Sequence, residues 1–194
     1  MKNNGLCGEQ GKELDNEMFR AAFRCEQLEH ELKKICGTLE KARIPFIPLK
    51  GSVLRRYYPE PWMRTSCDID VFVREADLDR AMEALSENLS YRIGEISDHD
   101  VQIYTPNGQH IELHRNLIED HRINQAAEVL AAVWDTAIPH SGWTYWLEMP
   151  DELFYFYHIA HKEAQRDGTP RRHEGRRGNY GARSLPRHEA AVKE

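Results

Sequence analysis

Two aspartates two positions apart, Asp68 and Asp70, lie in the segment Cys67-Asp-Ile-Asp-Val-Phe-Val73, whose alternating apolar residues are typical of a β-strand. Successive side chains of a strand point to opposite faces, so the two carboxylates share one face. The apolar residues of the other parity mark the opposite face as buried. Carboxylate oxygens are the ligands that Mg²⁺ and Mn²⁺ prefer. The pair therefore predicts a divalent-metal site on one face of a sheet.

A third carboxylate comes from the later segment His110-Ile-Glu-Leu-His114. Its apolar residues are Ile111 and Leu113, which leaves Glu112 and His114 on the opposite face. If this strand lies beside the one that carries the aspartates, three carboxylates converge, and a cation would neutralise their repulsion. His114 could be a ligand, a base or a surface histidine, and these three readings remain open.

Two other Asp-x-Asp segments in the chain serve as controls. Asp77-Leu-Asp79 falls in a predicted helix, where residues two apart point in different directions and cannot share an ion. Asp98-His-Asp100 precedes a strand and lacks apolar alternation on both sides. Neither is predicted to bind a metal.

A predicted strand over 44–49 runs into Lys50-Gly51-Ser52 and then into helical spacing. A glycine at a helix start lets the backbone approach a phosphate, and a serine hydroxyl adds a donor. Arg64 is a candidate phosphate clamp. The alternatives are a commonplace Gly-Ser turn, a lysine that snorkels from a strand end and an arginine in a structural salt bridge.

Composition limits the class of protein. A chain of 194 residues is long enough for one domain with a core and a helical appendage. Four cysteines form no CxxC pair, which argues against a zinc knuckle or a disulfide framework. A net charge of -6 argues against broad binding to duplex DNA. Without an apolar leader or an apolar run of spanning length, no membrane segment is expected, and the cytoplasm is the default location.

Helical periodicity is clearest from Leu14 to Ala42, where apolar residues recur every three or four positions. Further helices are predicted over 77–89, 124–134 and 151–161. Asn107-Gly108, between alternating runs over 101–105 and 110–114, predicts a hairpin. The aromatic residues of the connector before the last helix could stack on a ligand ring, although such clusters are more often core; they are Trp143, Tyr145 and Trp146.

These elements predict four segments. Residues 1–12 are expected to be disordered, 13–120 to form the catalytic domain with its N-terminal helix, and 121–161 to form a partial helical C-terminal region. Residues 162–194 are rich in Arg and Gly with few large apolar residues, and a disordered basic tail is expected. There are two alternatives: the tail docks RNA, or it originates from an out-of-frame end of a longer gene.

Together these residues resemble the polymerase-beta nucleotidyltransferase superfamily. More narrowly, four motifs are similar to its bacterial branch of uncharacterised nucleotidyltransferases, which are relatives of the aminoglycoside nucleotidyltransferases. The motifs are Leu49-Lys-Gly51, Arg64, Asp68-Ile-Asp70 and Ile111-Glu-Leu-His114. The resemblance covers roughly residues 44–117.

The resemblance implies an α/β (α+β) nucleotidyltransferase fold, in which a mixed β-sheet is covered by helices, with a long N-terminal helix and a truncated helical C-terminal region. It implies transfer of an NMP from an NTP such as ATP to an acceptor hydroxyl, with release of pyrophosphate. The acceptor, a small molecule, protein or RNA, and the oligomeric state stay open. Two Mg²⁺ or Mn²⁺ ions would be held by Asp68, Asp70 and Glu112. The nucleotide would be held by Lys50, Gly51, Ser52 and Arg64.

Two other functions are compatible with the sequence. A degenerate or truncated nucleotidyltransferase could act as a binding module, with the helix over 14–42 as its docking surface. A metal-dependent phosphoesterase is the third reading, but it would normally use more histidine than the carboxylate trio supplies. His158 and His161 lie three apart on the last predicted helix, and without a third ligand in view they are interpreted as structural.

Overall fold

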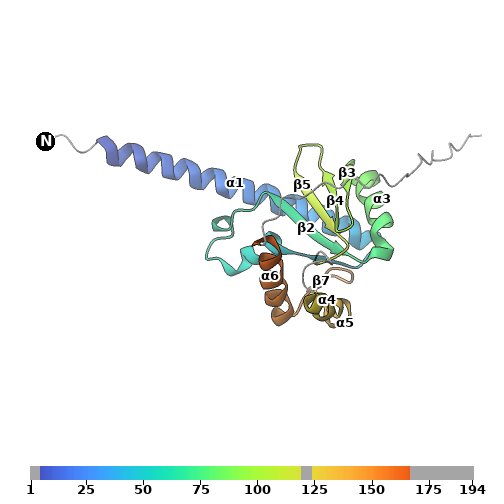
Figure 1. Cartoon of the computed structure of the whole chain (residues 1–194). Helices are drawn as coiled ribbons and strands as arrows, with labels where there is room; N and C mark the ends of the chain where they lie inside the picture. The colour runs from blue at the N-terminus through green and yellow to red at the C-terminus, as the bar shows by residue number, and fades with distance from the viewer. Residues whose placement is uncertain (1–4, 119–123, 167–194) are drawn as a thin grey trace, which may run out of the picture.

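The computed structural model describes residues 5–118 and 124–166 (Figure 1). The α-helices are α1 (Gly5–Lys41), α2 (Lys50–Leu54), α3 (Leu78–Leu89), α4 (Asn124–Ala131), α5 (Val133–Thr136) and α6 (Asp151–Arg166). The 3-10 helices are η1 (Arg55–Tyr57), η2 (Pro61–Met63) and η3 (Glu75–Asp77). The strands are β1 (Phe46–Pro48), β2 (Asp68–Val73), β3 (Arg92–Ile96), β4 (Asp100–Tyr104), β5 (His110–His114), β6 (Ile138–Pro139) and β7 (Leu147–Glu148).

The main sheet has the strand order β1-β2-β5-β4-β3 and is mixed. Strand β2 pairs in parallel with β5, and the other neighbours pair antiparallel. The parallel pairing requires a crossover, which α3 and the β3–β4 hairpin supply. This crossover places the two predicted acidic strands side by side. The predicted mixed sheet covered by helices is therefore confirmed.

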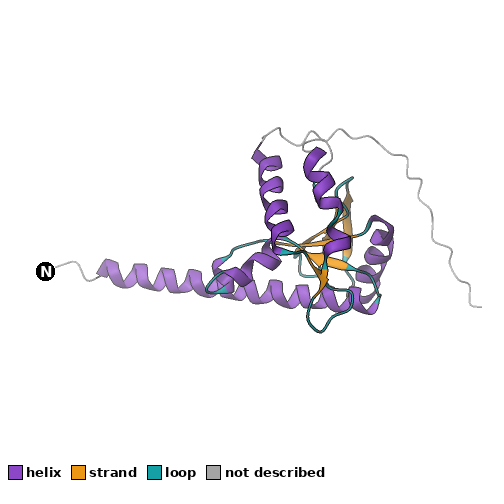
Figure 2. Cartoon of the chain, turned by 90° about the horizontal axis from the view of Figure 1, so that it is seen from below, coloured by secondary structure: helices purple, strands orange, loops and turns teal. Residues whose placement is uncertain are grey.

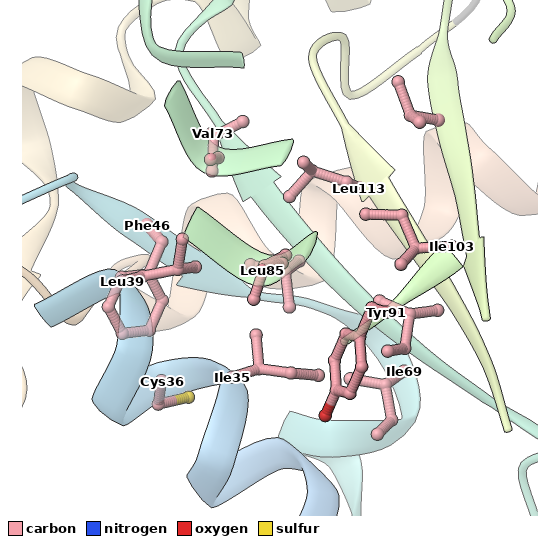
Figure 3. Packing of buried hydrophobic residues seen from close by; sticks show 14 of the residues in the cluster. Ile35, Cys36, Leu39, Phe46, Ile69, Val73, Leu85, Tyr91, Ile103 and Leu113 are labelled. Atoms are coloured by element: carbon pink, nitrogen blue, oxygen red, sulfur yellow. The ribbon is translucent and has the colours of Figure 1, made fainter. Parts of the chain in front are cut away.

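One face of the sheet packs against α1 and α3. Alternate residues of the strands, among them Ile69 and Leu113, point into this core and meet Ile35 and Leu39 of α1 and Leu85 of α3 (Figure 3). These side chains have no exposed surface. The layer is apolar, and it stabilises the sheet through the burial of hydrocarbon surface.

The other face of the sheet is covered by the C-terminal helices (Figure 2). Ile47 and Phe72 of the strands, and Leu49 just after β1, pack here against α4 and against Phe154 of α6. The sequence predicted only one buried face for the Asp68–Val73 strand. Because helices cover both sides, the ionisable residues of β2 lie under α6 rather than on an open surface.

Helix α1 begins at Gly5, earlier than the predicted start at Leu14, and includes much of the segment 1–12 that was expected to be disordered. Its N-terminal half projects away from the sheet (Figure 1). The apolar side chains of this half include Phe19 and Phe23, which are 74% and 57% exposed. Only the second half of α1 therefore contributes to the core.

The Asn107-Gly108 hairpin is confirmed. Gly108 has a φ of 81°, which a glycine adopts without strain, and its N–H donates to the carbonyl of Thr105. Strand β3 was not predicted, because its residues are partly exposed and do not alternate cleanly. Two of the later helices differ in length from their predictions: α4 ends at Ala131, and α6 continues to Arg166.

Within the described ranges, the helices are all too short or too polar to cross a membrane. Most of the predicted basic tail, from residue 167 onward, lies outside the described residues.

Candidate active site

The carboxylates meet because of the register between β2 and β5. Asp70 lies opposite Glu112, and Asp68 lies opposite His110, one pleat away. Residues that face each other across a strand pair share a face, so Asp68, Asp70 and Glu112 all lie on the face covered by α6. The predicted adjacency of the two strands is confirmed.

Asp70 is the centre of the cluster, with 1% of its surface exposed. Its Oδ1 accepts hydrogen bonds from Lys50 Nζ at 2.7 Å and from His114 Nε2 at 2.9 Å. Its Oδ2 is buried and has no partner among the described residues. A buried carboxylate oxygen without a donor is unfavourable, so Oδ2 is the atom that a cation would satisfy.

Two positive groups keep Asp70 ionised. Burial alone would raise its pKa, but the hydrogen bond from His114 and the charge of Lys50 outweigh burial and hold the pKa well below its usual range. Lys50 experiences the reverse balance: burial lowers its pKa, and Asp70 and Glu112 raise it to a value above normal. Lys50 therefore does not snorkel into solvent, because its ammonium group is an internal counter-charge for the carboxylates.

His114 bridges the two acidic side chains. It is 1% exposed, and its Nε2 lies 2.9 Å from Asp70 and 3.3 Å from Glu112 Oε2. Because carboxylates only accept, Nε2 carries the proton. The reading of His114 as a surface histidine is wrong, because α6 and the neighbouring strands bury it.

His99, which no sequence motif singled out, contacts His114. His99 Nε2 lies 3.2 Å from His114 Nδ1. His99, Asp100 and His114 can offer ligand atoms within 4.8 Å of one another, as can Asp70, Glu112 and His114. The Asp98-His-Asp100 segment is therefore closer to the site than its sequence pattern indicated, because the hairpin folds it against the end of β5.

Asp68 is at the edge of the cluster rather than in it. It is not among the three residues whose ligand atoms lie within 4.8 Å. Burial, followed by the charges of Asp70 and Glu112, raises its pKa. Asp68 thus lies within electrostatic reach of both other carboxylates.

The backbone at Lys50 is strained. Lys50 has a φ of 44°, in the left-handed region that side chains other than glycine rarely adopt. This conformation turns the chain from β1 into α2 directly beside Asp70, whose carbonyl accepts a hydrogen bond from Leu49 N–H. The strained conformation places the Lys50 ammonium group beside the carboxylates.

Gly51 has a packing role that the sequence did not predict. A Cβ on Gly51 would lie 2.8 Å from the side chain of Ser66, so only glycine fits this close approach. The Ser52 hydroxyl is buried and has no partner among the described residues. It can therefore still donate to a ligand.

Arg64 lies in the loop before β2. Its guanidinium donates to the carbonyl of Thr65. Its charge acts on His158 of α6, whose pKa is lowered first by burial and then by Arg64 and Lys50.

Helix α6 closes the site from the side opposite the sheet. Burial and the charges of Lys50 and His114 lower the pKa of His161 to about 4. Tyr157 is fully buried and stands beside both histidines, with ring centroids 5.4 Å from His158 and 5.7 Å from His161. The sequence placed His158 and His161 on one helix but could not show that this helix faces the carboxylates.

The aromatic connector belongs to the core. Trp143, Tyr145 and Trp146 pack against the α1 side of the sheet, and the backbone N–H groups of Tyr145 and Trp146 donate to Glu40. Their predicted alternative role, stacking on a ligand, has no support in this arrangement.

The residues at the site fit a divalent cation. The unpartnered Oδ2 of Asp70, the carboxylate of Glu112 and the nearby Asp68 supply the oxygen ligands that Mg²⁺ and Mn²⁺ prefer. Lys50, which is bonded to Asp70, and the unpartnered Ser52 hydroxyl supply donors for an anion. This set of groups can hold a divalent cation beside an anion.

The sequence matches the family described as uncharacterised nucleotidyltransferase over residues 3–172, which is most of the chain. The chain belongs to this nucleotidyltransferase family. The match includes the sheet, all residues of the site and the whole of α6. This nucleotidyltransferase is therefore an enzyme of the branch that its motifs resemble.

Other comparisons are more distant. No curated protein matches the nucleotidyltransferase. One similar solved structure is the solution structure of the antibiotic-resistance factor ANT(2'')-Ia, with 16% identity over 71% of this chain and 82% of that one, at a TM-score of 0.40. Another is the crystal structure of ANT(2")-Ia in complex with adenylyl-2"-tobramycin, with 17% identity over 75% and 82% of the two chains, at a TM-score of 0.48. Neither likeness is close enough to carry over a substrate.

Proposed function

We propose that this nucleotidyltransferase transfers an NMP from a metal-bound NTP to an acceptor hydroxyl and releases pyrophosphate. The observation that carries the proposal is the state of Asp70: buried, ionised, held by Lys50 and His114 through Oδ1, and without a partner at Oδ2. Most buried side-chain polar atoms have a hydrogen-bond partner, so the unpartnered Oδ2 favours a bound cation there. An aspartate prepared for a cation keeps one oxygen free.

Two Mg²⁺ or Mn²⁺ ions belong to the proposal, with Asp68 and Asp70 as ligands of both and Glu112 as a ligand of one. Bound divalent cations would supply Lewis-acid polarisation of the phosphate and acceptor oxygens. Mg²⁺ is the default, because it pairs with NTP phosphates and accepts carboxylate ligands.

The residues of the site have separate roles in the proposed reaction. Asp70 is fixed by Lys50 and His114, so its free oxygen has one orientation before a ligand arrives. Lys50, Arg64, Ser52 and the Gly51 backbone hold the triphosphate. The acceptor oxygen forms a bond to the α-phosphorus, the bond from that phosphorus to the bridging oxygen breaks, pyrophosphate leaves and the acceptor proton passes to solvent.

His114 is assigned to positioning rather than to metal binding. Its Nε2 already donates to the two carboxylates, and its Nδ1 faces His99. A histidine held in this way orients the carboxylates that would bind the metal, as hydrogen-bond partners of metal ligands commonly do.

Label transfer tests this function. The full chain is incubated with Mg²⁺, a lysate separated into metabolite, protein and RNA fractions, and NTPs labelled at either the α- or the γ-phosphate. We expect label in one fraction from the α-labelled NTP only, and none in EDTA or with Asp70→Asn. Transfer of γ-label would indicate a kinase reaction, and transfer in EDTA would exclude the proposed metal chemistry.

A further inference from the structure

Two histidines and an aspartate form a second group of ligating side chains beside the carboxylate cluster. His99 Nε2 and His114 Nδ1 are 3.2 Å apart, and Asp100 lies opposite His114 where β4 pairs with β5. One ligand atom from each of the three lies within 4.8 Å of the others. The two rings do not stack, since their planes meet at 73°, and they contact each other through their nitrogens. The three groups are therefore close enough to bind one ion.

The turn before β4 holds two of these ligands in place. Ser97 Oγ accepts hydrogen bonds from the backbone N–H groups of His99 and Asp100, and it lies 2.7 Å from Asp100 Oδ1, to which it donates. The carbonyl of His99 accepts hydrogen bonds from the N–H groups of Arg115 and Asn116, directly after β5. Because the turn is tied to the sheet on both sides, the ligands are positioned before an ion arrives.

The spacing of the two nitrogens fits a tetrahedral transition-metal ion. Zn²⁺ binds imidazole nitrogen at about 2.0 to 2.1 Å, so two nitrogens on one tetrahedral ion lie about 3.3 Å apart. The separation of 3.2 Å between His99 and His114 agrees with this geometry. Imidazole suits Zn²⁺ and its neighbours in the first transition series, whereas Mg²⁺ and Mn²⁺ prefer oxygen ligands. This group therefore selects another class of ion than the carboxylate cluster does.

His114 can serve both groups because its two ring nitrogens point in different directions. Its Nε2 donates to Asp70 at 2.9 Å, which leaves Nδ1 as the lone-pair nitrogen of the neutral ring. A metal-bound histidine commonly donates its other N–H to a carboxylate, which orients the ring. Asp70 supplies that carboxylate, so His114 binds an ion through Nδ1 and keeps its positioning role through Nε2.

Access and charge also favour a cation at this place. His99 and Asp100 are partly exposed, so an ion can reach them from solvent. Arg115, at the end of β5, has its positive charge balanced by Glu75 at 3.1 Å and by Asp98 at 3.8 Å.

We propose that His99, Asp100 and His114 bind a transition-metal ion of the Zn²⁺ class, with water as the remaining ligand. The site is separate from the ions assigned to the carboxylates, and it does not depend on nucleotidyl transfer. When the ion binds, the hydrogen-bonding proton between the two imidazole nitrogens leaves to solvent. The ion then fixes the ring of His114, and through that ring the orientation of Asp70.

Co²⁺ is the probe for this site, because its absorption spectrum distinguishes tetrahedral from octahedral coordination. The full chain is freed of metal with EDTA, transferred into excess Mg²⁺ to occupy the carboxylate cluster, and titrated with Co²⁺. We expect the intense visible band of tetrahedral Co²⁺, saturating at about one ion per chain and displaced by Zn²⁺.

Two glutamine variants locate the binding. His99→Gln removes a ligand and should weaken Co²⁺ binding more than about a hundredfold, since even the outer partners of metal ligands contribute on the order of ten- to a hundredfold. His30→Gln is the matched control, because His30 is an exposed histidine of α1, and its spectrum should match that of the wild type. Zn²⁺ should raise the melting temperature of the wild type and of His30→Gln, but not that of His99→Gln. Mn²⁺ binding should persist in His99→Gln, which separates this site from the carboxylate cluster.

A weak octahedral spectrum in the wild type, or an unchanged tetrahedral spectrum in His99→Gln, would overturn the inference. If circular dichroism in EDTA shows that His99→Gln is unfolded, Asp100→Ala takes its place. That variant should also bind Co²⁺ more weakly, and wild-type affinity would overturn the inference. Absence of label transfer in the functional assay would remove the proposed function and leave this inference standing.

Discussion

The two faces of the sheet differ although they are made by the same strands. On the face toward α1 and α3, alternate residues such as Ile69, Val71 and Leu113 are apolar and fully buried. On the face toward α6, the intervening residues include Asp70, Glu112 and His114. On the first face these strand residues are apolar, whereas the second face holds several ionisable side chains in a partly satisfied network. The apolar face therefore serves stability, and the ionisable face serves chemistry.

This separation has a physical basis. Apolar burial is non-directional and can be supplied by any well-packed face. Buried charges are costly unless their partners are placed accurately, so a protein retains them where they do chemistry. Changes on the two faces should therefore have different signatures.

The largest effect is expected on the α6 face. Asp70→Asn removes a metal ligand and the partner of two positive groups, so nucleotidyl transfer should fall on the order of a thousandfold. Transfer from α-labelled NTP measures it. Asp98→Asn is the control, since Asp98 belongs to another Asp-x-Asp and is fully exposed, and its activity should stay within about twofold. Comparable losses in both variants would remove the distinction between the two motifs.

On the apolar face, Leu85→Ala should lower the free energy of unfolding by about 2 to 5 kcal/mol, because a fully buried leucine is replaced by a cavity. Denaturant titration followed by circular dichroism measures this change. At a temperature where the variant stays folded, its affinity for Mg²⁺ and an NTP analogue should equal that of the wild type. An affinity loss similar to that of an α6-face variant would show that the faces are not independent.

Lys50→Met should change two affinities in opposite directions. Removing the ammonium group 2.7 Å from Asp70 leaves more negative charge for a cation, so Mn²⁺ alone should bind more tightly. The NTP analogue should bind about tenfold more weakly, because a charged phosphate donor is lost. Calorimetry measures both.

Lys34→Met is the matched control for Lys50→Met. Lys34 pairs with Glu31 on α1, away from the site, and its removal should alter neither affinity. Weaker binding of Mn²⁺ to Lys50→Met would contradict the role of Lys50 as a counter-charge to the carboxylates.

A smaller effect is expected from the pH dependence of stability. Burial opposes protonation of His114, but hydrogen bonds to Asp70 and Glu112 outweigh it and raise its pKa above 6.5. A raised pKa in the folded state stabilises the protein below the unfolded pKa, and this contribution is lost as pH rises through the folded value.

The variant His114→Gln, which cannot become charged, tests this effect. In EDTA, the wild type should exceed the variant in melting temperature most below about pH 6.5, and the difference should shrink as pH rises beyond that value. A difference that grows with pH would contradict the assigned protonation.

Local patterns in the sequence were sufficient for much of the site. Alternation placed Asp68 and Asp70 on one face, and Asn107-Gly108 located the hairpin that brings Glu112 into position. These features depend on neighbours in the chain. The resemblance supplied the order of the elements, and the family match agrees with it.

Other features depend on tertiary structure and had no sequence signal. The salt bridge from Lys50 to Asp70 requires a positive φ at Lys50, which its residue type does not predict. Helix α6 packs on the carboxylate side of the sheet, and helical periodicity predicts which of its residues are buried but not what they pack against. His99 reaches His114 through the unpredicted β3–β4 hairpin.

We propose that Asp70 and Glu112 on the α6 face hold a divalent cation. A Mn²⁺ titration of the full chain, followed by electron paramagnetic resonance, measures this binding in the wild type, Asp70→Asn and Glu112→Gln. We expect saturable binding by the wild type that is lost in Asp70→Asn and weakened in Glu112→Gln. Binding of Mn²⁺ to Asp70→Asn with wild-type affinity would contradict it.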